Sequence, residues 1–245
     1  MTTPQSVFIT GASSGLGRGL ALHYANAGAR VWAAARRKEE LEKLAAETSG
    51  ITPVVLDVTD SGKLAAAIQG LGELDLVIAN AGVGQPTSAR KMDWKAVKTL
   101  LEVNATAACV TIAAALPKMI ERDRGQVVAI SSLAGLLGMP GHAAYCASKA
   151  AVHTFMESVR VDLRGTRVRA TTIYPGFVKT ELTAKNKFPM PFLMELDDAV
   201  RVMARGIERG AKTVAYPLPM VAVTRAMAAI PRAIYEPLAA RTRMF

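Results

Sequence analysis

Tyr145 and Lys149, in the stretch HAAYCASKAAV, are two side chains whose types and spacing could transfer a proton. Residues four apart on a helix share one face. A free tyrosine has a pKa near ~10, too high for acid–base work at neutral pH, and a nearby ammonium favours the phenolate and lowers that pKa. The lysine head also carries three hydrogen-bond donors that can hold a ribose. Without context, the same spacing fits an exposed lysine and a half-buried tyrosine on an ordinary helix.

Ser132 and Asn104 are further polar candidates. Ser132 ends the predicted strand 125–132, thirteen residues before Tyr145, where a hydroxyl can bond a substrate carbonyl. Ser131 is the alternative, and strand alternation turns it to the other face. Asn104 lies among apolar residues of a helix predicted over 94–122. A buried amide that is satisfied by its neighbours is the other interpretation of Asn104.

The stretch TGASSGLG at residues 10–17 predicts a phosphate-binding turn. Gly11 can make the sharp turn, Gly15 lets a phosphate approach the backbone, and Gly17 permits close packing of helix on sheet. The next helix begins with free N–H groups and the positive end of its dipole, which attract a pyrophosphate. An ordinary loop is the alternative. The predicted nucleotide contacts in this turn are Gly11, Ser13, Ser14, Gly15, Leu16 and Gly17.

The end of the second predicted strand, AAARRKEE, indicates which dinucleotide is bound. Ala35 stands where NAD-binding folds often place an acid for the ribose hydroxyls. Arg36 and Arg37 follow, and an arginine can hold a 2′-phosphate through two parallel charge-assisted bonds. We therefore expect NADP(H), with Arg36 as the main contact and Arg37 or Ser14 in support. Two arginines at the start of a surface helix are the alternative.

Strand-like and helix-like runs alternate along the whole chain. Repeated alternation of this kind predicts a Rossmann-type, doubly wound parallel α/β sheet with helices on both faces. Ligands of such sheets lie at the carboxyl ends of the strands. No linker divides residues 1–245, so one domain is expected. The predicted strands, about seven, cover residues 6–10, 30–35, 52–58, 74–82, 125–132, 168–176 and 212–217.

These motifs together resemble the short-chain dehydrogenase/reductase family over residues 6–182. The matches are the glycine spacing of residues 11–17, NAG at 80–82, LEVNATA around Asn104, LDVTD at 56–60, the Ser132/Tyr145/Lys149 set and YPGFVKTEL at 174–182. The resemblance implies that Tyr145 is the general acid in reduction, Ser132 polarises the carbonyl, Lys149 lowers the tyrosine pKa and Asn104 positions a proton-relay water. Further implied cofactor contacts are Asp57, Val58, Asn80, Ala81, Gly82, Tyr145, Lys149, Pro175, Gly176, Val178 and Thr180.

Composition and charge argue against several other classes of protein, namely nucleic-acid-binding, disulfide-rich, metal-binding and secreted proteins. Residues 160–245 hold 15 Lys/Arg against 7 Asp/Glu, out of a net charge of +10 for the chain. A basic surface can attract an anionic ligand or simply face solvent, and no nucleic-acid motif accompanies it. Two cysteines make no disulfide framework, the three histidines lack metal-ligand spacing, and the first residues do not form a signal peptide. A cytoplasmic protein without a metal is expected.

Residues 183–196 and 217–245 are the parts that depart most from the family pattern. The first is apolar and interrupted by prolines, which suits a lid over an apolar or lipid-like substrate, or packing onto the domain. The second predicts short helices over 220–230 and 232–241, with arginines at 225, 232, 241 and 243. This tail could cover the pocket, form a dimer interface or lie on an anionic membrane. Many family members end in a D-G-G segment used in tetramers; its absence favours a homodimer.

The leading hypothesis is an NADP(H)-dependent oxidoreductase that interconverts a ketone or aldehyde with an alcohol on an apolar substrate. An NAD(H)-dependent alcohol dehydrogenase and a non-catalytic nucleotide-sensing protein on the same fold are the alternatives. The complete set of Asn104, Ser132, Tyr145 and Lys149 disfavours the sensor, which needs no acid–base pair. The family's epimerases and dehydratases usually carry a larger substrate domain than the roughly 60 residues after the last motif.

Overall fold

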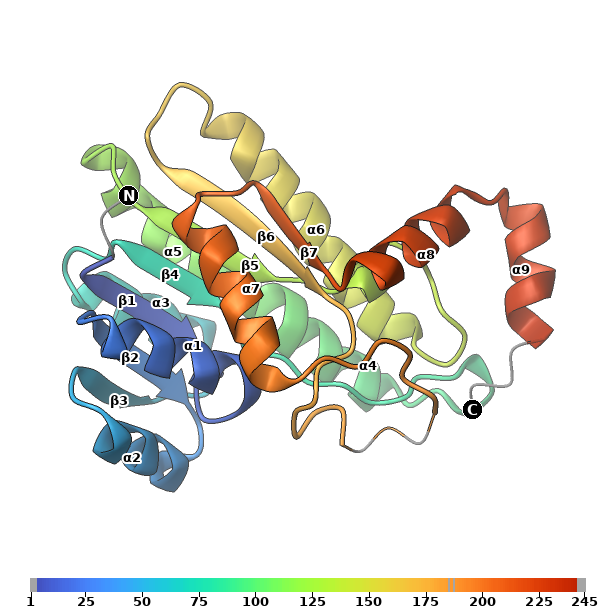
Figure 1. The fold of residues 1–245 in the computed structure, drawn as a ribbon, viewed down its shortest axis with the longest axis horizontal. Coiled ribbons are helices and arrows are strands. Elements are labelled where there is room, and N and C mark those ends of the chain that lie inside the picture. The colour runs from blue at the N-terminus through green and yellow to red at the C-terminus, as the bar shows by residue number, and fades with distance from the viewer. Residues whose placement is uncertain (1–3, 185, 187, 242–245) are drawn as a thin grey trace.

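Seven parallel strands form one sheet at the centre of the protein, in the order β3-β2-β1-β4-β5-β6-β7 (Figure 1). The computed structural model describes residues 4–184, 186 and 188–241. Apolar, β-branched runs in the sequence predicted buried strands. The observed sheet confirms the expected Rossmann-type architecture. The strands are β1 (Ser6–Thr10), β2 (Arg30–Ala35), β3 (Ile51–Val55), β4 (Leu76–Ala79), β5 (Gln126–Ile130), β6 (Arg169–Pro175) and β7 (Thr213–Tyr216).

Helices cover both faces of this sheet (Figure 1). One core joins the sheet to three helices, α1 (Gly15–Asn26), α2 (Lys38–Glu47) and α7 (Leu196–Glu208). The other core lies between the opposite face and three helices, α3 (Ser61–Gly70), α5 (Ala107–Glu121) and α6 (Ala143–Asp162). Strands buried on both faces explain why the predicted strands are continuously apolar rather than alternating.

The strand order reverses between β1 and β4. The chain builds outward from β1 through β2 to β3 and then returns to place β4 beside β1. Ligands of open α/β sheets bind in the crevice outside the carboxyl ends of the strands at such a switch point. Thr10 and Ala79 end the two strands, and the glycine turn and Asn80 follow them directly.

The long helix predicted over 94–122 consists of three pieces. α4 (Trp94–Leu101) and α5 are joined by a π-helical turn, Glu102–Thr106, with Asn104 at its centre. Single π turns inside α-helices occur often at functional sites. The run Trp94–Glu121 is long and apolar enough to cross a membrane, but half of its apolar window is buried inside the protein. We interpret it as a core helix of the domain.

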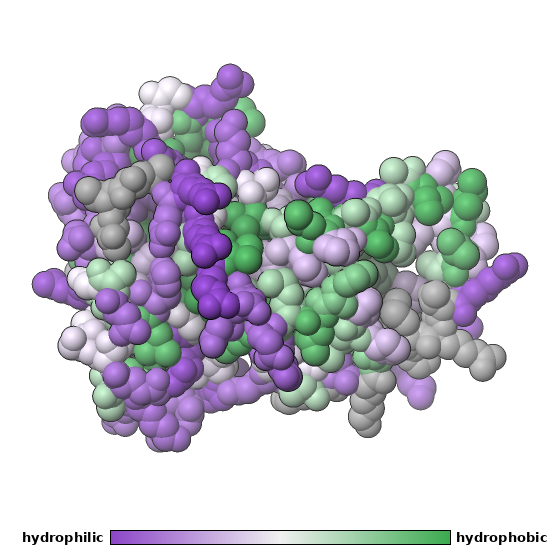
Figure 2. Space-filling model, viewed as in Figure 1, coloured by the Kyte–Doolittle hydropathy of each residue, from purple (hydrophilic) through white to green (hydrophobic). Residues whose placement is uncertain are grey.

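The C-terminal tail extends away from the sheet as two helices, α8 (Leu218–Ala229) and α9 (Arg232–Arg241) (Figure 1). α8 begins two residues before the predicted 220, with Pro219 in its first turn, where proline is tolerated. Tyr235 anchors α9, because its hydroxyl donates to Gly138 O at 2.7 Å. Figure 2 shows apolar surface over this end of the molecule. The tail residues that expose large apolar side chains are Leu218, Val223, Met227, Ile234 and Leu238.

Candidate active site

The glycine turn is fixed by contact with the segment that follows β4. Gly11 has a φ of +68°, and a Cβ there would lie 2.7 Å from Ala81 Cα. A Cβ on Gly17 would overlap the side-chain amide of Asn80 and the Gly11 carbonyl. Asn80 Nδ2 donates to Thr10 O at 2.9 Å and to Gly11 O at 3.2 Å. Only glycine fits at these two positions, and Asn80 holds the turn in shape.

Thr10 is a structural residue of this site that the sequence analysis did not single out. Its buried hydroxyl accepts hydrogen bonds from Asn80 N at 3.0 Å and from Ala81 N at 3.1 Å. It thus joins the carboxyl ends of β1 and β4 at the switch point. The signal that could have revealed it is a hydroxyl residue at the end of a strand, directly before the first glycine of the turn.

The N-terminus of α1 suits an anionic ligand. Ser14 is the N-cap residue in an extended conformation, its side chain makes no capping bond, and the first turn holds no acidic residue. The first N–H groups of a helix have no partner within it, so they can bind a phosphate. Gly15 (φ +53°) would bring a Cβ within 3.4 Å of Thr180 Cγ2. The turn therefore fits a pyrophosphate between the start of α1 and Thr180, with Leu16 partly buried beside it.

Arg37, rather than Arg36, faces the glycine turn. Arg37 Nε donates to Ser13 Oγ at 3.2 Å, and its Nη1 lies 2.9 Å from Glu181 Oε2. Arg36 is 68% exposed, and its Nη1 lies 3.8 Å from Asp57 Oδ2. Successive side chains at the end of a strand point to opposite sides, so only one of the pair can turn toward Ser13. Both arginines flank the predicted adenosine site; which of them holds a 2′-phosphate stays a prediction.

Asp57 and Val58 follow β3 at the same edge of the sheet. Asp57 Oδ1 accepts hydrogen bonds from the backbone N–H of Thr59 at 3.0 Å and from its hydroxyl at 2.9 Å. The backbone hydrogen bond above all lowers the pKa of the Asp57 carboxyl. Val58 is buried in the core. The two residues therefore occupy the predicted adenine side of the crevice, with Asp57 charged.

Tyr145 and Lys149 lie on the first turns of α6, as their spacing predicted. Lys149 is 4% exposed, and its Nζ donates to Ile130 O at 2.9 Å. Its Nζ is 6.0 Å from the centroid of the Tyr145 ring. Burial lowers the pKa of Lys149 to about 8, because a charged ammonium is poorly solvated there. The ammonium is therefore beside the phenol but bonded to the backbone of β5.

The pKa of Tyr145 differs from the expectation that Lys149 would lower it. Burial raises the pKa of Tyr145, and its hydrogen bond with Ser132 opposes that rise without reversing it. Lys149 does not offset this effect, because burial disfavours its own charge and its head points to Ile130 O. Tyr145 is therefore protonated at neutral pH and able to donate its proton.

Ser131 and Ser132 point to different sides, as strand alternation predicts. Ser131 is buried and donates to Lys149 O at 2.8 Å. Ser132 Oγ accepts from Ala134 N at 3.1 Å and lies 3.4 Å from Pro175 O. The next short turn approaches α6 closely, since a Cβ on Gly135 would lie 2.8 Å from Lys149 O. This close packing brings the Ser132 hydroxyl, and not that of Ser131, to Tyr145.

Asn104 connects the segment after β4 to α6. Its Oδ1 accepts from Val83 N at 2.7 Å, and its Nδ2 donates to Val83 O at 3.0 Å and to Ser148 Oγ at 3.1 Å. A Cβ on Gly82 would lie 3.4 Å from Asn104 Oδ1 and 3.6 Å from Lys149 Nζ. The amide of Asn104 is therefore engaged with backbone and with α6, and its place in a proton relay stays a prediction. Ser148 was not foreseen as its partner.

The segment after β6 closes one side of the site. Gly176 N donates to Tyr216 O at 2.7 Å, and Val178 and Met194 form a parallel bridge. Thr180 N donates to Thr183 Oγ1 at 3.0 Å in a tight turn. The predicted contacts Pro175, Gly176, Val178 and Thr180 are thus brought to the carboxyl edge of the sheet, near the glycine turn.

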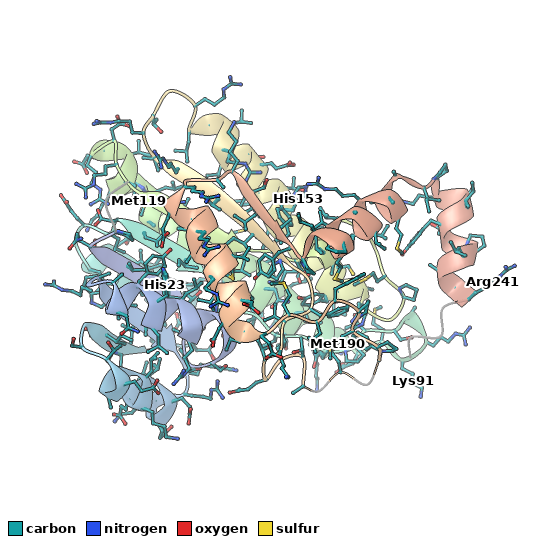
Figure 3. The ribbon with its side chains drawn as sticks, viewed as in Figure 1. His23, Lys91, Met119, His153, Met190 and Arg241 are labelled. Carbon is teal, nitrogen blue, oxygen red and sulfur yellow. The ribbon has the colours of Figure 1, made fainter. Side chains whose placement is uncertain are left out.

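The predicted lid, residues 183–196, reaches the start of α6. The Phe188 ring lies 5.6 Å from the ring of His142, the residue before α6, and 5.9 Å from that of Phe177. Met190, labelled in Figure 3, lies in this segment. Phe192 and Leu193 are exposed, and Leu196 already begins α7. Residues 185 and 187 of the predicted lid lie outside the described residues.

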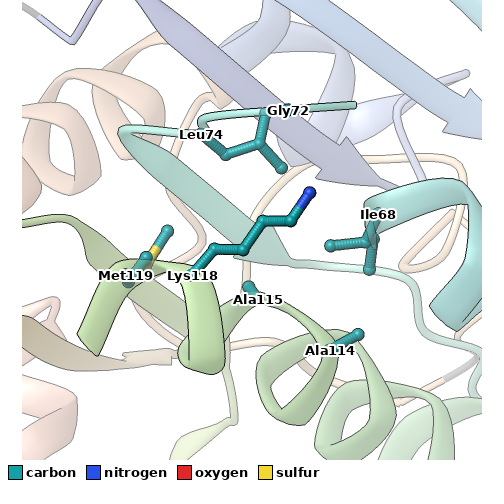
Figure 4. A pocket seen from close by; sticks show the side chains of 7 residues that line it. All are labelled: Ile68, Gly72, Leu74, Ala114, Ala115, Lys118 and Met119. Atoms are coloured by element: carbon teal, nitrogen blue, oxygen red, sulfur yellow. The ribbon is translucent and has the colours of Figure 1, made fainter. Parts of the chain in front are cut away.

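Two hollows in the surface lie away from this site. One, of about 10 Å³, lies between the ends of α3 and α5, and the side chain of Lys118 extends between Leu74 and Ile68 there (Figure 4). Such a volume holds at most about one water. The other is a groove beside Trp32, at the amino ends of β1 and β2. Both are at the edge of the sheet opposite the glycine turn, away from Ser132, Tyr145 and Lys149.

Comparisons with known proteins show the family and the fold of this chain. The model of the short chain dehydrogenase family matches residues 5–189. An uncharacterized oxidoreductase of Myxococcus xanthus is 52% identical over 247 residues, covering 98% of each chain. A short chain dehydrogenase from Burkholderia cenocepacia in complex with NADP has a TM-score of 0.84 and 27% identity, covering 97% of this chain and 99% of that one. One from Burkholderia phymatum in complex with NAD has a TM-score of 0.83 at 23% identity, over 92% and 94% of the chains, and shares the fold.

The fold and the site thus define an α/β oxidoreductase that acts on CH–OH groups with a nicotinamide dinucleotide. The chain belongs to the short-chain dehydrogenase/reductase family. The family resemblance seen in the motifs is confirmed, whereas the preference between NAD and NADP and the substrate are not fixed by membership alone.

Proposed function

We propose that this protein is an NADP(H)-dependent oxidoreductase that interconverts a ketone or aldehyde with an alcohol on an apolar substrate. The observation that carries the proposal is the partly buried Tyr145, protonated at neutral pH, hydrogen-bonded to Ser132 and beside Lys149. A protonated phenol next to a hydroxyl is the arrangement that general-acid reduction of a carbonyl needs. The proposal covers both directions, with carbonyl reduction favoured at neutral pH.

The residues present fit the cofactor. The start of α1 and the glycine turn would hold the pyrophosphate, Asp57 the adenine side, and Lys149 the nicotinamide ribose. When bound, the cofactor supplies the hydride for reduction or accepts it in oxidation. Tyr145 gives its phenolic proton to the substrate oxygen as the C=O π bond becomes a new O–H bond. Ser132 donates to the same oxygen, and solvent returns a proton to the Tyr145 phenolate.

NADP(H) is proposed because of the charges after β2. Ala35 provides no carboxylate for ribose hydroxyls, and Arg36 and Arg37 offer two guanidinium groups at adjacent positions. Arg37 already bonds Ser13 of the glycine turn. The Burkholderia cenocepacia neighbour binds NADP on the same fold, which supports the proposal. An NAD(H)-dependent alcohol dehydrogenase is the outcome expected if both arginines serve only the surface of α2.

An apolar substrate is proposed from the side chains around the lid. Phe177 and Phe188 contact one another, and Phe188 contacts His142 before α6. Leu133 and Leu137 after Ser132 are buried and pack against α8 and α9. Apolar walls with few polar groups favour ligands of matching character.

We also propose that the protein works in the cytoplasm as a homodimer and touches anionic membranes through its tail. The exposed apolar residues of α8 and α9 stand among Arg225, Arg232 and Arg241, a composition that suits an anionic lipid surface; Arg243 lies outside the described residues. Light scattering at several protein concentrations tests the dimer. Co-sedimentation with phosphatidylserine-containing vesicles, against phosphatidylcholine alone, tests the membrane contact, and equal pelleting contradicts it.

The test of the catalytic proposal is turnover by the wild type and by Tyr145→Phe. Aryl ketones, medium-chain ketones and aldehydes are screened for consumption of NADPH. Tyr145→Phe is expected to abolish turnover while NADPH binding, followed by its fluorescence, stays nearly intact. Turnover retained in Tyr145→Phe refutes the assignment. Cofactor binding without turnover of any carbonyl or alcohol supports the nucleotide-sensing alternative.

A further inference from the structure

Thr87 is a buried polar residue that belongs to none of the motifs. It lies in the segment between β4 and α4 and is 1% exposed. The neighbouring Gln85 and Pro86 are exposed. A threonine buried in an otherwise exposed loop needs hydrogen-bond partners for its hydroxyl, so its contacts indicate what it does.

The hydrogen bonds of Thr87 reach the start of α6. Its Oγ1 accepts a hydrogen bond from Ala144 N at 3.0 Å. Its backbone N donates to Gly141 O at 2.7 Å, and it forms a parallel bridge with His142. Thr87 therefore binds three successive parts of the turn that leads into the catalytic helix, from 57 residues away in the sequence.

α6 has no N-terminal capping group of its own. The N-cap residue is His142, whose side chain does not cap the helix and whose ring contacts Phe188 instead. The first turn holds no acidic residue. A side-chain oxygen that accepts from N2 or N3 normally comes from the N-cap residue itself; here Thr87 supplies that oxygen to Ala144, the residue directly before Tyr145.

The segment that carries Thr87 is held to α6 at its other end as well. Asn104 bonds both backbone groups of Val83 and also donates to Ser148 Oγ. Residues 83–87 thus contact the catalytic helix through Thr87 at Ala144 and through Asn104 at Ser148. Tyr145 lies between these two attachments, on the turn of helix that they hold.

We propose that Thr87 is a positioning residue that caps the catalytic helix and thereby sets the place of the Tyr145 hydroxyl. The proposal rests on the general-acid role of Tyr145 in the proposed function. Loss of the Thr87 hydroxyl would leave the Ala144 N–H without its acceptor and loosen the first turn of α6. Tyr145 would then hold its hydrogen bond with Ser132 less well, while the nucleotide site at the glycine turn would keep its geometry.

The test compares Thr87→Val, which keeps the shape but not the hydroxyl, with Thr87→Ser, which keeps the hydroxyl. Thr99→Val is the matched control, because that hydroxyl bonds Lys95 O within its own helix α4. Hydrogen exchange of the amides of residues 143–146 is expected to quicken by about 5-fold in Thr87→Val, the typical effect of losing a cap. Exchange in Thr87→Ser and in Thr99→Val is expected to match the wild type.

Ultraviolet titration of the Tyr145 phenol reports its position without any substrate. The signal is the absorbance of each protein minus that of the same protein carrying Tyr145→Phe. The groups that act on this phenol are Ser132 from the loop after β5 and Cys146 and Lys149 from α6. Because the Ser132 hydrogen bond lowers the phenol pKa, its weakening is expected to move the titration of Tyr145 to higher pH in Thr87→Val and not in Thr87→Ser.

Kinetics completes the test with whichever carbonyl the wild type reduces. Thr87→Val is expected to lower kcat about 10-fold, because the phenol is less well placed, with an unchanged KM for NADPH, and Thr87→Ser to restore kcat. If the Tyr145 titration and the amide exchange of Thr87→Val equal those of the wild type, the proposal is overturned, even if no substrate is found. Inactivity of Tyr145→Phe alongside a normal Thr87→Val overturns it while leaving the proposed function standing. If Thr87→Val does not fold, Thr87→Ala is measured against Thr87→Ser in the same way.

Discussion

Arg37 and Glu181 form an ion pair that joins the predicted 2′-phosphate site to the start of the lid. Arg37 Nη1 lies 2.9 Å from Glu181 Oε2, and the same guanidinium bonds Ser13 of the glycine turn. The two side chains are 45% and 64% exposed, so the pair contributes only about 0–1 kcal/mol. A carboxylate held against the arginine that faces the glycine turn competes with any phosphate for that arginine.

Removing this carboxylate is therefore expected to favour the phosphorylated cofactor. Glu181→Gln should bind NADPH up to about 5-fold more tightly, because the weak pair no longer has to be broken, and should bind NADH unchanged. Glu195→Gln is the matched control, since Glu195 pairs with Lys179 at 2.9 Å in the neighbouring segment. Titration of cofactor fluorescence measures both. Weaker NADPH binding in Glu181→Gln would mean that Glu181 orients Arg37 instead of competing for it.

The two arginines can be ranked by separate substitutions. Arg36→Ala and Arg37→Ala should each raise KM for NADPH far more than KM for NADH, because only NADPH carries the 2′-phosphate. A charge-assisted bidentate contact is worth about 1.5–3 kcal/mol, which corresponds to roughly 10- to 100-fold in KM. The larger effect identifies the main contact, expected at Arg36 from the sequence and favoured at Arg37 by its bond to Ser13. Equal changes for NADPH and NADH would rule out 2′-phosphate recognition by either.

Lys149 is expected to make the stability of the cofactor-free protein depend on pH. Its pKa falls from an ordinary 10.5 to about 8 on folding. Between these values the unfolded chain binds more protons than the folded one, so the free energy of unfolding rises with pH across that window. Below about pH 8 the cost of the buried ammonium is present in full.

The variant Lys149→Met tests this dependence. It should be more stable than the wild type at pH 7, by roughly 1–3 kcal/mol, since it removes a buried charge. The difference should shrink as the pH approaches 10, and taking the difference cancels the tyrosines that titrate in the same range. Urea unfolding at several pH values measures it. A stability difference that stays constant across this pH range would show that burial does not lower the pKa of Lys149.

The architecture could be predicted from the sequence because the patterns that indicate strands and helices are local. Gly11 and Gly17 could be assigned to a turn from spacing alone, since the backbone contacts that exclude a Cβ are common to such turns. The spacing of Ser132, Tyr145 and Lys149 likewise placed them at one edge of the sheet. Spacing could not predict which distant group a polar side chain binds once the chain is folded. Arg37 turns to Glu181, 144 residues away, and Lys149 turns to Ile130 O, which leaves the pKa of Tyr145 governed by burial.

Asn104 is expected to contribute to the thermal stability of the protein, whatever its role in catalysis. Its amide satisfies both the N–H and the C=O of Val83 and reaches Ser148. Asn104→Ala removes all three bonds and leaves backbone groups in a partly buried segment unpaired, at about 1–3 kcal/mol for each buried group. We therefore expect Asn104→Ala to lower the Tm clearly. Ser148→Ala removes the bonds of its hydroxyl with Asn104 and with Tyr145 O but leaves both Val83 bonds in place, so it should lower the Tm by less. Thermal unfolding of both variants compares them, and a Tm of Asn104→Ala equal to that of Ser148→Ala would show that the π turn does not depend on the Val83 bonds.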